Sequence, residues 1–162
     1  MTLTDAQKAT LKTHILANQD TATLYADGNL DRLAQLLNAD ATPSFFVWKI
    51  AVVVDDIMGN GFDWTRVDNL TVGKARIWEW MTRLGVINMA KTNIRAGIEA
   101  CFTADVADRP NRTAVYQHGQ RRASRIERLF ATGTGTTTDD RGVGPGLLGY
   151  EGPINYTELI GL

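Results

Sequence analysis

The spacing of apolar residues near the N-terminus predicts two helices. In the first, Leu11, Ile15 and Leu16 fall on one face behind a capping box that Thr4 and Gln7 would form. We expect this helix to run to about Asn18. The second follows a polar break and begins near Asn29, and it should end before the Thr42-Pro43 pair because a residue that precedes proline disfavours helical backbone. Its apolar face consists of Leu30, Leu33, Leu36 and Leu37.

Three of the four tryptophans lie in the stretch 62–84, which we expect to be central to the fold. They are Trp64, Trp78 and Trp80. From Leu70 onward the stretch predicts a helix, with Asn69 as its N-cap and Gly85 after its last turn. Its expected apolar face is Leu70, Ile77, Met81 and Leu84. Tryptophans on two sides of one helix indicate that both sides are covered, so the three tryptophans are candidate core or subunit-interface residues.

Two more helices are predicted in the second half of the chain. One begins at Asn88 after a very short connection, so it should form an α-hairpin with the tryptophan helix, and Gly97 would allow the two to approach closely. The other begins near Asp105 or Asp108, with Pro110 in its first turn. The inner face of this last, long helix should hold Ala114, Val115, His118, Ile126, Leu129 and Phe130.

Residues 45–54 form the most apolar run in the chain, and their conformation has two interpretations. The run is rich in aromatic and β-branched residues, which favour a strand. It lacks alternation, however, and no second clear strand is predicted to satisfy its backbone hydrogen bonds. The run is therefore either an extended segment that crosses the core between helices or a strand that pairs with a neighbouring subunit.

The composition changes abruptly at residue 132. Glycine and threonine dominate the next stretch, which has no helical or strand periodicity and cannot bury enough apolar surface to fold by itself. Spaced hydrophobic residues follow it, and they would serve either as anchors of a docking tail or as contacts of a tail that wraps back on its own domain. The candidate anchors are Leu147, Leu148, Tyr150, Ile154 and Tyr156.

These patterns together predict a mainly α fold. Residues 1–131 would form a small bundle of about five helices with one extended apolar segment, and residues 132–162 a linker and a long extended docking arm. With 162 residues, 44% hydrophobic and 22% charged, the composition is typical of one globular domain. No apolar run approaches the ~18 residues of a membrane span, and the N-terminus has no signal-peptide pattern, so we expect no membrane partner and synthesis in the cytoplasm.

The net charge of −1 conceals a basic segment between Asp108 and Arg128, which contains six arginines and two acidic residues. Arg121, Arg125 and Arg128 would lie on one face of the last helix, with Arg122 alongside. Such a stripe can neutralise phosphates of a nucleic acid, and it can equally pair with carboxylates of a partner subunit. No aromatic residues for base stacking are interleaved with the arginines.

The residues of catalytic and metal sites are sparse, and the sequence predicts no enzyme, no cofactor and no metal. The two histidines are more than a hundred positions apart, and the single cysteine, Cys101, lies among apolar neighbours and should be a buried structural thiol. Gly133-x-Gly135 lacks the preceding strand and the lysine of a phosphate-binding loop. The acidic pairs at 55–56 and 139–140 are typical of solvated loops.

Three blocks of the sequence resemble small structural proteins encoded in tailed-phage and prophage morphogenesis clusters. They are NGFDWTRVDNLTVGKARIWEW, NIRAGIEACF and RIERLFATGTGTTTDD. The chain is similar in plan to the head-to-tail adaptor (connector) class, in which a compact helical domain forms a ring beneath the portal and a C-terminal arm inserts into the portal or neighbouring subunits. The apolar run at 45–54 is a departure from that plan.

The resemblance implies a non-enzymatic virion protein, assembled in the host cytoplasm, that joins capsid to tail. Its partners would be the portal protein, neighbouring copies of itself, and a tail or head-closure protein, with packaged DNA in passing. The five hydrophobic residues of the arm would then be docking anchors, and the four arginines would meet an adjacent copy or line a DNA passage. The alternatives are a nucleic-acid-binding accessory protein that uses the arginine helix and a capsid decoration or head-completion protein.

Overall fold

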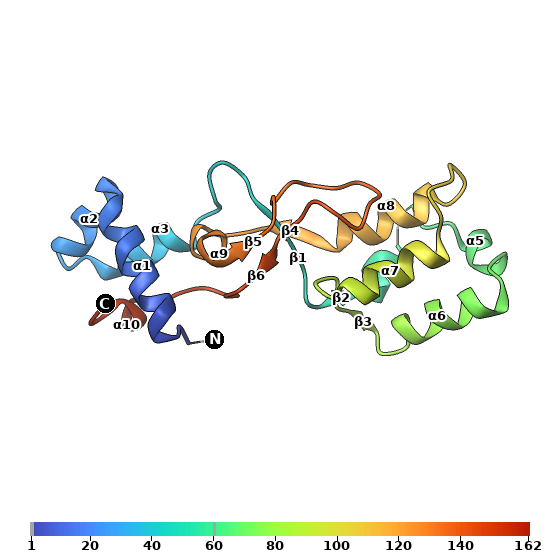
Figure 1. Ribbon diagram of the computed structural model, residues 1–162, viewed down its shortest axis with the longest axis horizontal. Coiled ribbons are helices and arrows are strands. Elements are labelled where there is room, and N and C mark those ends of the chain that lie inside the picture. Colours follow the sequence, from blue (N-terminus) through green and yellow to red (C-terminus); the bar gives the residue numbers. More distant parts are fainter. Residues whose placement is uncertain (1, 60) are drawn as a thin grey trace. The chain divides into compact units, whose positions relative to one another are not determined.

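The protein is mainly helical, in agreement with the sequence. The computed structural model describes residues 2–59 and 61–162, and these ranges contain ten helices and six short strands (Figure 1). They form two compact units, one of residues 2–45, 122–132 and 148–162, the other of residues 46–59, 61–121 and 133–147. The chain therefore passes between the units four times. The predicted bundle of about five helices and the predicted long arm are not confirmed.

The first unit is built mainly from the N-terminal helices. Its elements are α1 (Asp5–Ala17), α2 (Gln19–Ala26), α3 (Leu30–Asn38), α9 (Arg125–Phe130), β5 (Ala131–Thr132) and α10 (Tyr156–Leu159). The predicted capping box is confirmed, since the Thr4 hydroxyl accepts from the Gln7 N–H at 3.2 Å and the Gln7 side chain accepts from the Thr4 N–H at 2.9 Å. The polar break expected after residue 18 is instead the helix α2, whose Thr21 is buried and donates to the Ile15 carbonyl.

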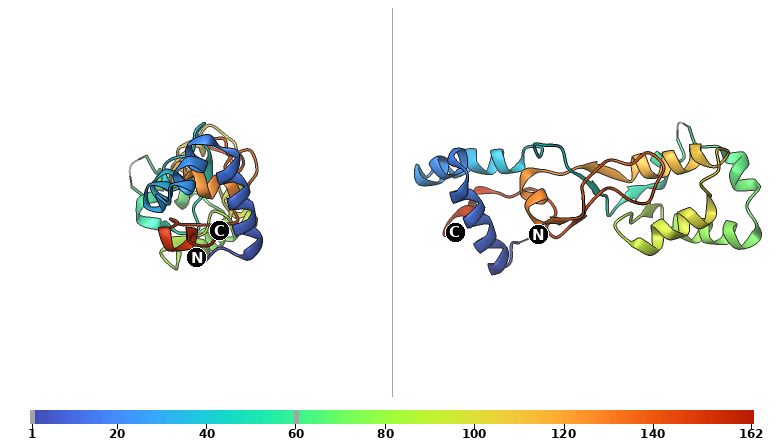
Figure 2. Two further views of the ribbon diagram at one scale, coloured as in Figure 1. Left: turned by 90° about the vertical axis from the view of Figure 1, so that its left-hand side faces the viewer. Right: turned by 45° about the horizontal axis from the view of Figure 1, so that its top comes forward.

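The core of the first unit includes side chains from the C-terminal segment. Helices α1, α3, α9 and α10 contribute buried residues to it, and α10 lies beside α3 (Figure 2). The Asn38 side chain forms hydrogen bonds with both backbone groups of Ile154. Its Oδ1 accepts from the Ile154 N–H at 2.8 Å, and its Nδ2 donates to the Ile154 carbonyl at 2.7 Å. The buried members of this core are Leu3, Leu11, Ile15, Leu33, Ala34, Leu37, Ile126, Tyr150, Ile154 and Leu159.

The second unit combines helices with short strands. Its elements are β1 (Phe46–Trp48), β2 (Val52–Val53), α4 (Val54–Ile57), α5 (Trp64–Asp68), α6 (Val72–Thr82), β3 (Val86–Ile87), α7 (Thr92–Cys101) and α8 (Arg109–His118). β4 (Gln120–Arg122) and β6 (Leu147–Leu148) lie where the chain leaves this unit. The predicted α-hairpin is confirmed, because α6 packs on α7 and a side chain added at Gly97 would come within 3.0 Å of Met81 Sδ.

The apolar run at 45–54 pairs within its own chain, so the expectation that it has no strand partner is wrong. β1 pairs with β4, and β2 pairs antiparallel with β3, with Val52 opposite Ile87 and Val53 opposite Val86. β5 pairs with β6, whose Leu148 belongs to the first unit. The partner strands are only two or three residues long, and strands of that length carry no periodicity that a sequence pattern could reveal.

Aromatic rings form much of the second unit's core. The rings of Phe62 and Trp78 stack with their centroids 5.7 Å apart, and Phe102 meets Trp78 edge-on at 5.1 Å. The ring centroids of Trp48 and Tyr116 are 5.9 Å apart. Each such ring buries a large apolar area, so these residues contribute strongly to the stability of the unit.

The glycine- and threonine-rich segment is attached to the second unit by polar contacts, although it has too few apolar residues to fold alone. Arg95 Nε donates to the Gly142 carbonyl at 3.1 Å, and the Gly142 N–H donates to Glu99 Oε1 at the same distance. The Gln120 side chain accepts from the Thr138 N–H at 3.1 Å. Residues 133–147 are therefore ordered by side chains that lie far away in sequence.

Candidate interaction surface

The helix α6 presents tryptophan to the core on one side and to solvent on the other. It begins after Thr71 rather than Asn69. Gly85 follows it, as the sequence predicted, and has the left-handed conformation (φ +73°) common after helix ends. Trp78 is 4% exposed, whereas Trp80 is 69% exposed. Residues two positions apart on a helix point in widely different directions, so only one of the two can enter the core.

The expected apolar face of this helix is wrong in part. Ile77 and Leu84 were expected to be buried, but Ile77 is more than one-third exposed and Leu84 is 82% exposed. The core side of the helix is instead formed by Trp78 with the partly buried Met81, and Leu70, which precedes the helix, packs against the same core. The outer side of the helix carries Trp80. Ile77 lies on the flank toward α7, where a side chain added at Gly97 would come within 3.5 Å of its Cγ2, and Leu84 lies in the turn that follows the helix. We call Ile77, Trp80 and Leu84 the α6 face.

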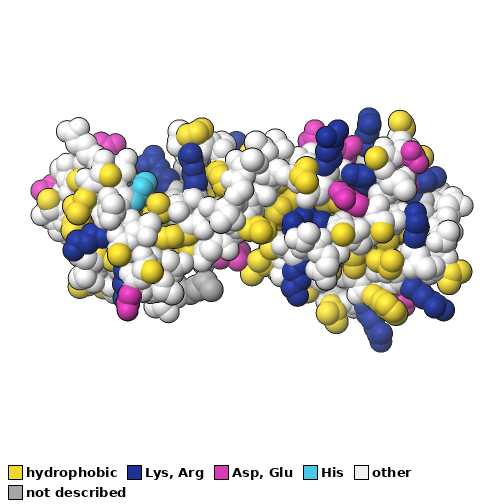
Figure 3. All heavy atoms as spheres, in the orientation of Figure 1, with side chains coloured by type: hydrophobic (Ala, Val, Ile, Leu, Met, Phe, Trp, Pro, Cys, Tyr) yellow, Lys and Arg dark blue, Asp and Glu magenta, His cyan; other side chains and the backbone are white. Residues whose placement is uncertain are grey.

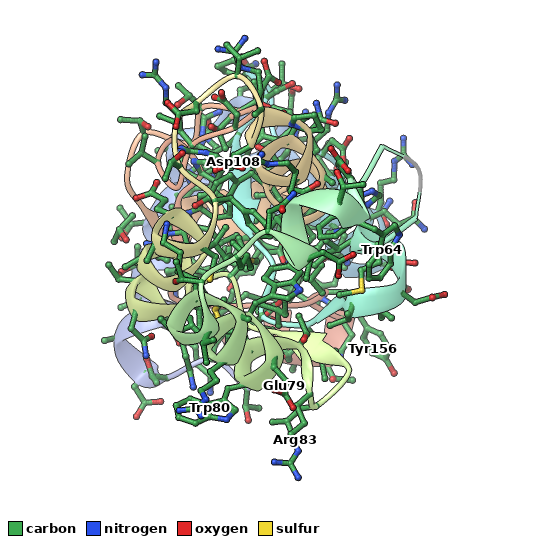
Figure 4. The ribbon with its side chains drawn as sticks, turned by 90° about the vertical axis from the view of Figure 1, so that its right-hand side faces the viewer. Trp64, Glu79, Trp80, Arg83, Asp108 and Tyr156 are labelled. Carbon is green, nitrogen blue, oxygen red and sulfur yellow. The ribbon has the colours of Figure 1, made fainter. Side chains whose placement is uncertain are left out.

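Charged side chains surround the α6 face. Glu79, Trp80 and Arg83 project outward from the helix in Figure 4, while Asp108 lies inside the unit. Arg76, Glu79 and Arg83 are exposed, and in the described part of the chain none of them has an ion pair. Figure 3 shows hydrophobic side chains interspersed with Lys and Arg along the edge of the second unit where α6 lies. An apolar centre with a charged rim is typical of protein interfaces.

The adjoining strands extend the exposed apolar surface. Val86 of β3 and Val53 of β2 lie opposite each other in the antiparallel pair, and both are nearly half exposed. Val86 follows Leu84 by two residues, so the surface is continuous along the chain from the helix to the strand pair. Contiguous exposed apolar surface on a small domain marks an interaction site more often than scattered single residues do.

Trp64, the third candidate core or interface residue, lies apart from the α6 face. It begins the short helix α5, where Asp63 is the N-cap and accepts from the Thr65 N–H at 3.0 Å. The Trp64 ring is 54% exposed and meets Phe62 edge-on at 5.3 Å. Of the three tryptophans, Trp78 is thus a core residue, and Trp64 and Trp80 are on the surface.

The predicted docking anchors have different environments. Tyr150 and Ile154 are buried in the first unit, where Tyr150 meets Phe130 edge-on at 6.1 Å. Leu148 is partly buried, while Leu147 and Tyr156 are exposed. In this conformation the segment wraps back on its own unit, which is the second of the two interpretations of the sequence. The backbones of Gly149 and Phe130 lie close together, because a side chain added at Gly149 would come within 2.6 Å of the Phe130 carbonyl oxygen.

The predicted arginine stripe does not exist as one helix face. The expected long helix ends at His118, and Arg121 and Arg122 lie on the strand β4. Arg125 and Arg128 lie on α9, which starts anew with a capping box between Ser124 and Glu127. Arg122 forms an exposed ion pair with Asp40 at 3.5 Å. The Ser124-x-x-Glu127 pattern is the sequence signal that could have revealed this break.

The shifted pKa values of Cys101 and Tyr116 in the second unit have structural causes. Cys101 is buried as expected, its thiol donates to the Lys74 carbonyl at 3.3 Å, and burial raises the pKa of this thiol. Burial likewise raises the pKa of Tyr116, whose hydroxyl donates to the Arg95 carbonyl. In the described residues, no group of three or more His, Cys, Asp or Glu side chains is placed to hold a metal ion.

A buried carboxylate connects three segments of the second unit. Asp108 accepts from Arg66 Nε at 2.7 Å, and its other oxygen accepts from the N–H and the hydroxyl of Thr103 at 2.7 and 2.9 Å. Burial alone would raise the pKa of Asp108, but the bonds from Thr103 and Arg66 outweigh it and lower the pKa. This group has a structural role, because every one of its contacts is internal.

The surface best suited to a function is therefore the α6 face. Within the described ranges, no helix is long and apolar enough to cross a membrane. Comparison with protein-family models found no match, and searches of curated proteins and of solved structures also found none.

Proposed function

We propose that this chain is a non-enzymatic structural protein of a tailed-phage virion, an adaptor that assembles as a ring on the portal and joins capsid to tail. The observation that carries the proposal is the exposed α6 face. Trp80 and Leu84 leave most of their side-chain area in water. Burial of one such side chain against a partner is worth about 1.5–3 kcal/mol, which is the gain that an assembly protein would use.

The charged rim supports a protein partner for this face. Arg76 and Arg83 outnumber Glu79 around the apolar residues, so a partner with apolar residues and an acidic border would match it. A neighbouring copy and the portal protein are the two partners that the adaptor plan supplies. A nucleic-acid partner is less well supported, because Arg121 and Arg122 lie on β4 while Arg125 and Arg128 lie on α9.

The adaptor plan also assigns residues 132–162 to a docking arm. In this proposal Leu147 and Tyr156 make the first contacts with the portal, because both are exposed. Tyr150 and Ile154 would reach a partner only after their release from the core of the first unit. Such a segment would exchange one set of apolar contacts for another during assembly.

The double substitution Trp80→Ser and Leu84→Ser tests the α6 face. We expect it to weaken association with the portal or with neighbouring copies by about 30-fold or more, the loss typical of a central interface residue. The folded state should be little affected, since both side chains are exposed. Affinity capture from the native source, with captured proteins identified by mass, and light scattering of the purified chain measure the two kinds of association.

The matched control is Val72→Ser, which removes an apolar residue that is 71% exposed at the N-terminal end of the same helix, more than two turns away from Trp80. This control should associate as the unmodified chain does. Capture of the same virion partner at an unchanged level by the double variant would contradict the role of the α6 face. Capture of nuclease-sensitive DNA without any virion protein would favour the nucleic-acid-binding alternative instead.

A further inference from the structure

The first unit contains a cavity that the proposed adaptor function does not use. It has a volume of about 670 Å³ and is lined by residues of α1, α3 and α9 together with the start of α2 and the stretch 41–42. Cavities of about 300–1,000 Å³ are the size that holds small organic ligands. All the elements that line it belong to the same unit, so the cavity is complete within that unit.

Two arginines line the cavity, and they differ in the contacts that their side chains make. Arg128 Nη1 donates to the Pro43 carbonyl at 3.0 Å, and its guanidinium lies 5.9 Å from the centre of the Phe45 ring. These contacts hold Arg128 in place. Arg125 has no side-chain hydrogen bond or ion pair with any residue that the structure describes, although it is partly buried. A guanidinium has five N–H donors, so Arg125 is available to bind an anion.

The charge around the cavity favours an anionic ligand. The lining holds two arginines, Arg125 and Arg128, and one carboxylate, that of Asp20, so positive charge is in excess. Guanidinium groups bind carboxylates and phosphates through paired, charge-assisted hydrogen bonds. Asn18 and Thr42 add further polar groups to the lining.

The remainder of the lining is apolar. Leu37 and Ala41 are buried, and Leu129 is the apolar lining residue that remains partly exposed. An inorganic ion would fill only a fraction of this volume and would leave Leu129 in contact with water. A ligand with an apolar or planar body would cover this side chain and gain from its burial.

We propose that this cavity binds a small organic anion. A phosphate or carboxylate group lies between Arg125 and Arg128, and an apolar body lies against Leu129. The ligand is a free small molecule, because the residues that line the site all belong to one unit and enclose a volume of small-molecule size. The inference is independent of the proposed virion function.

Calorimetric titration of the full chain with simple probes tests the proposal. The probes are phenyl phosphate and benzoate, which carry both a head group and a body, inorganic phosphate, which lacks the body, and benzyl alcohol, which lacks the charge. We expect saturable binding of phenyl phosphate, benzoate or both, at least about tenfold tighter than that of inorganic phosphate or benzyl alcohol. Which of the two head groups binds more tightly distinguishes a phosphate ligand from a carboxylate ligand.

Arg125→Gln is the decisive variant, because the Arg125 side chain makes no internal bond whose loss would unfold the unit. It should weaken binding of the organic anions by about tenfold or more, the effect expected when a charged hydrogen-bond donor is lost. Arg32→Gln, which changes an exposed arginine of α3 that only contacts Gln35, is the matched control and should bind normally.

Three results would overturn the inference. One is the absence of saturable binding of both organic anions up to a concentration on the order of 10 mM. Another is equal affinity of the Arg125→Gln variant and the unmodified chain. The third is inorganic phosphate that binds as tightly as phenyl phosphate, since the apolar lining would then contribute nothing.

Discussion

A chain that ends at Leu147 is expected to lose the folded first unit. The deletion removes Tyr150, Ile154 and Leu159, which are all buried in the core of that unit. Loss of each large buried side chain costs about 2–5 kcal/mol, and the whole stability of a domain is only about 5–15 kcal/mol. The two bonds between Asn38 and Ile154 are lost as well. Amide hydrogen exchange, followed in α1 and α3 of the full and shortened chains, measures the effect.

A substitution in the same segment provides the control for this deletion. Ile160→Ala changes a residue that is 62% exposed, so exchange in α1 and α3 should remain as slow as in the full chain. If the shortened chain retained full protection in these helices, residues 148–162 would be a detachable arm, as the adaptor plan implies. The deletion leaves residues 133–147 in place, so the second unit serves as an internal reference.

Asp108→Ala is expected to destabilise the second unit by about 1–3 kcal/mol, the cost typical of leaving hydrogen-bonding groups without their partner, because Asp108 is buried but the Arg66 side chain is partly exposed. The substitution leaves Arg66 Nη2, now 2.6 Å from an Asp108 oxygen, without its counterion, and it removes the acceptor of the Thr103 N–H. Asp105→Ala is the matched control, because Asp105 also accepts from the Thr103 hydroxyl but is exposed. Urea unfolding of the three proteins at neutral pH gives the difference directly. Equal midpoints for Asp108→Ala and the unmodified chain would contradict the prediction.

The stabilising effect of Asp108 should depend on pH in a defined direction. Its pKa is lowered in the folded state, so its contribution is fully present above the unfolded-state pKa of about 3.9 and is lost as the pH falls through the folded-state pKa. The difference in melting temperature between the unmodified chain and Asp108→Asn should therefore shrink below about pH 4. A difference that stayed constant down to about pH 2 would show that the carboxylate charge is not what stabilises the unit.

Local signals in the sequence determined the features that depend on a few adjacent residues. The capping box at Thr4, the left-handed Gly85 and the helix start around Pro110 are all present in the structure. The burial of Cys101 and the close approach at Gly97 also follow from their immediate neighbours. These predictions held because backbone preference and capping act over one helical turn.

Tertiary packing decided which candidate residues are available to a partner. A tryptophan at position 78 or at position 80 could equally have entered the core, and only the position of α7 and the rings of Phe62 and Phe102 selected Trp78. Trp80 was thereby left on the surface with Leu84. The same holds for Tyr150 and Ile154, whose spacing is compatible with a docking arm but whose side chains are buried in the first unit.

Sequence patterns were sufficient to predict that the chain is mainly helical, where several of its helices begin or end, and that Cys101 is buried. The pairing of the short strands, the division of the arginines between β4 and α9, and the exposure of the α6 face were decided only by the tertiary structure. The physical reason is the range of the interactions. Helix signals are contained within a few consecutive residues, whereas strand pairing and burial depend on segments that are distant in sequence.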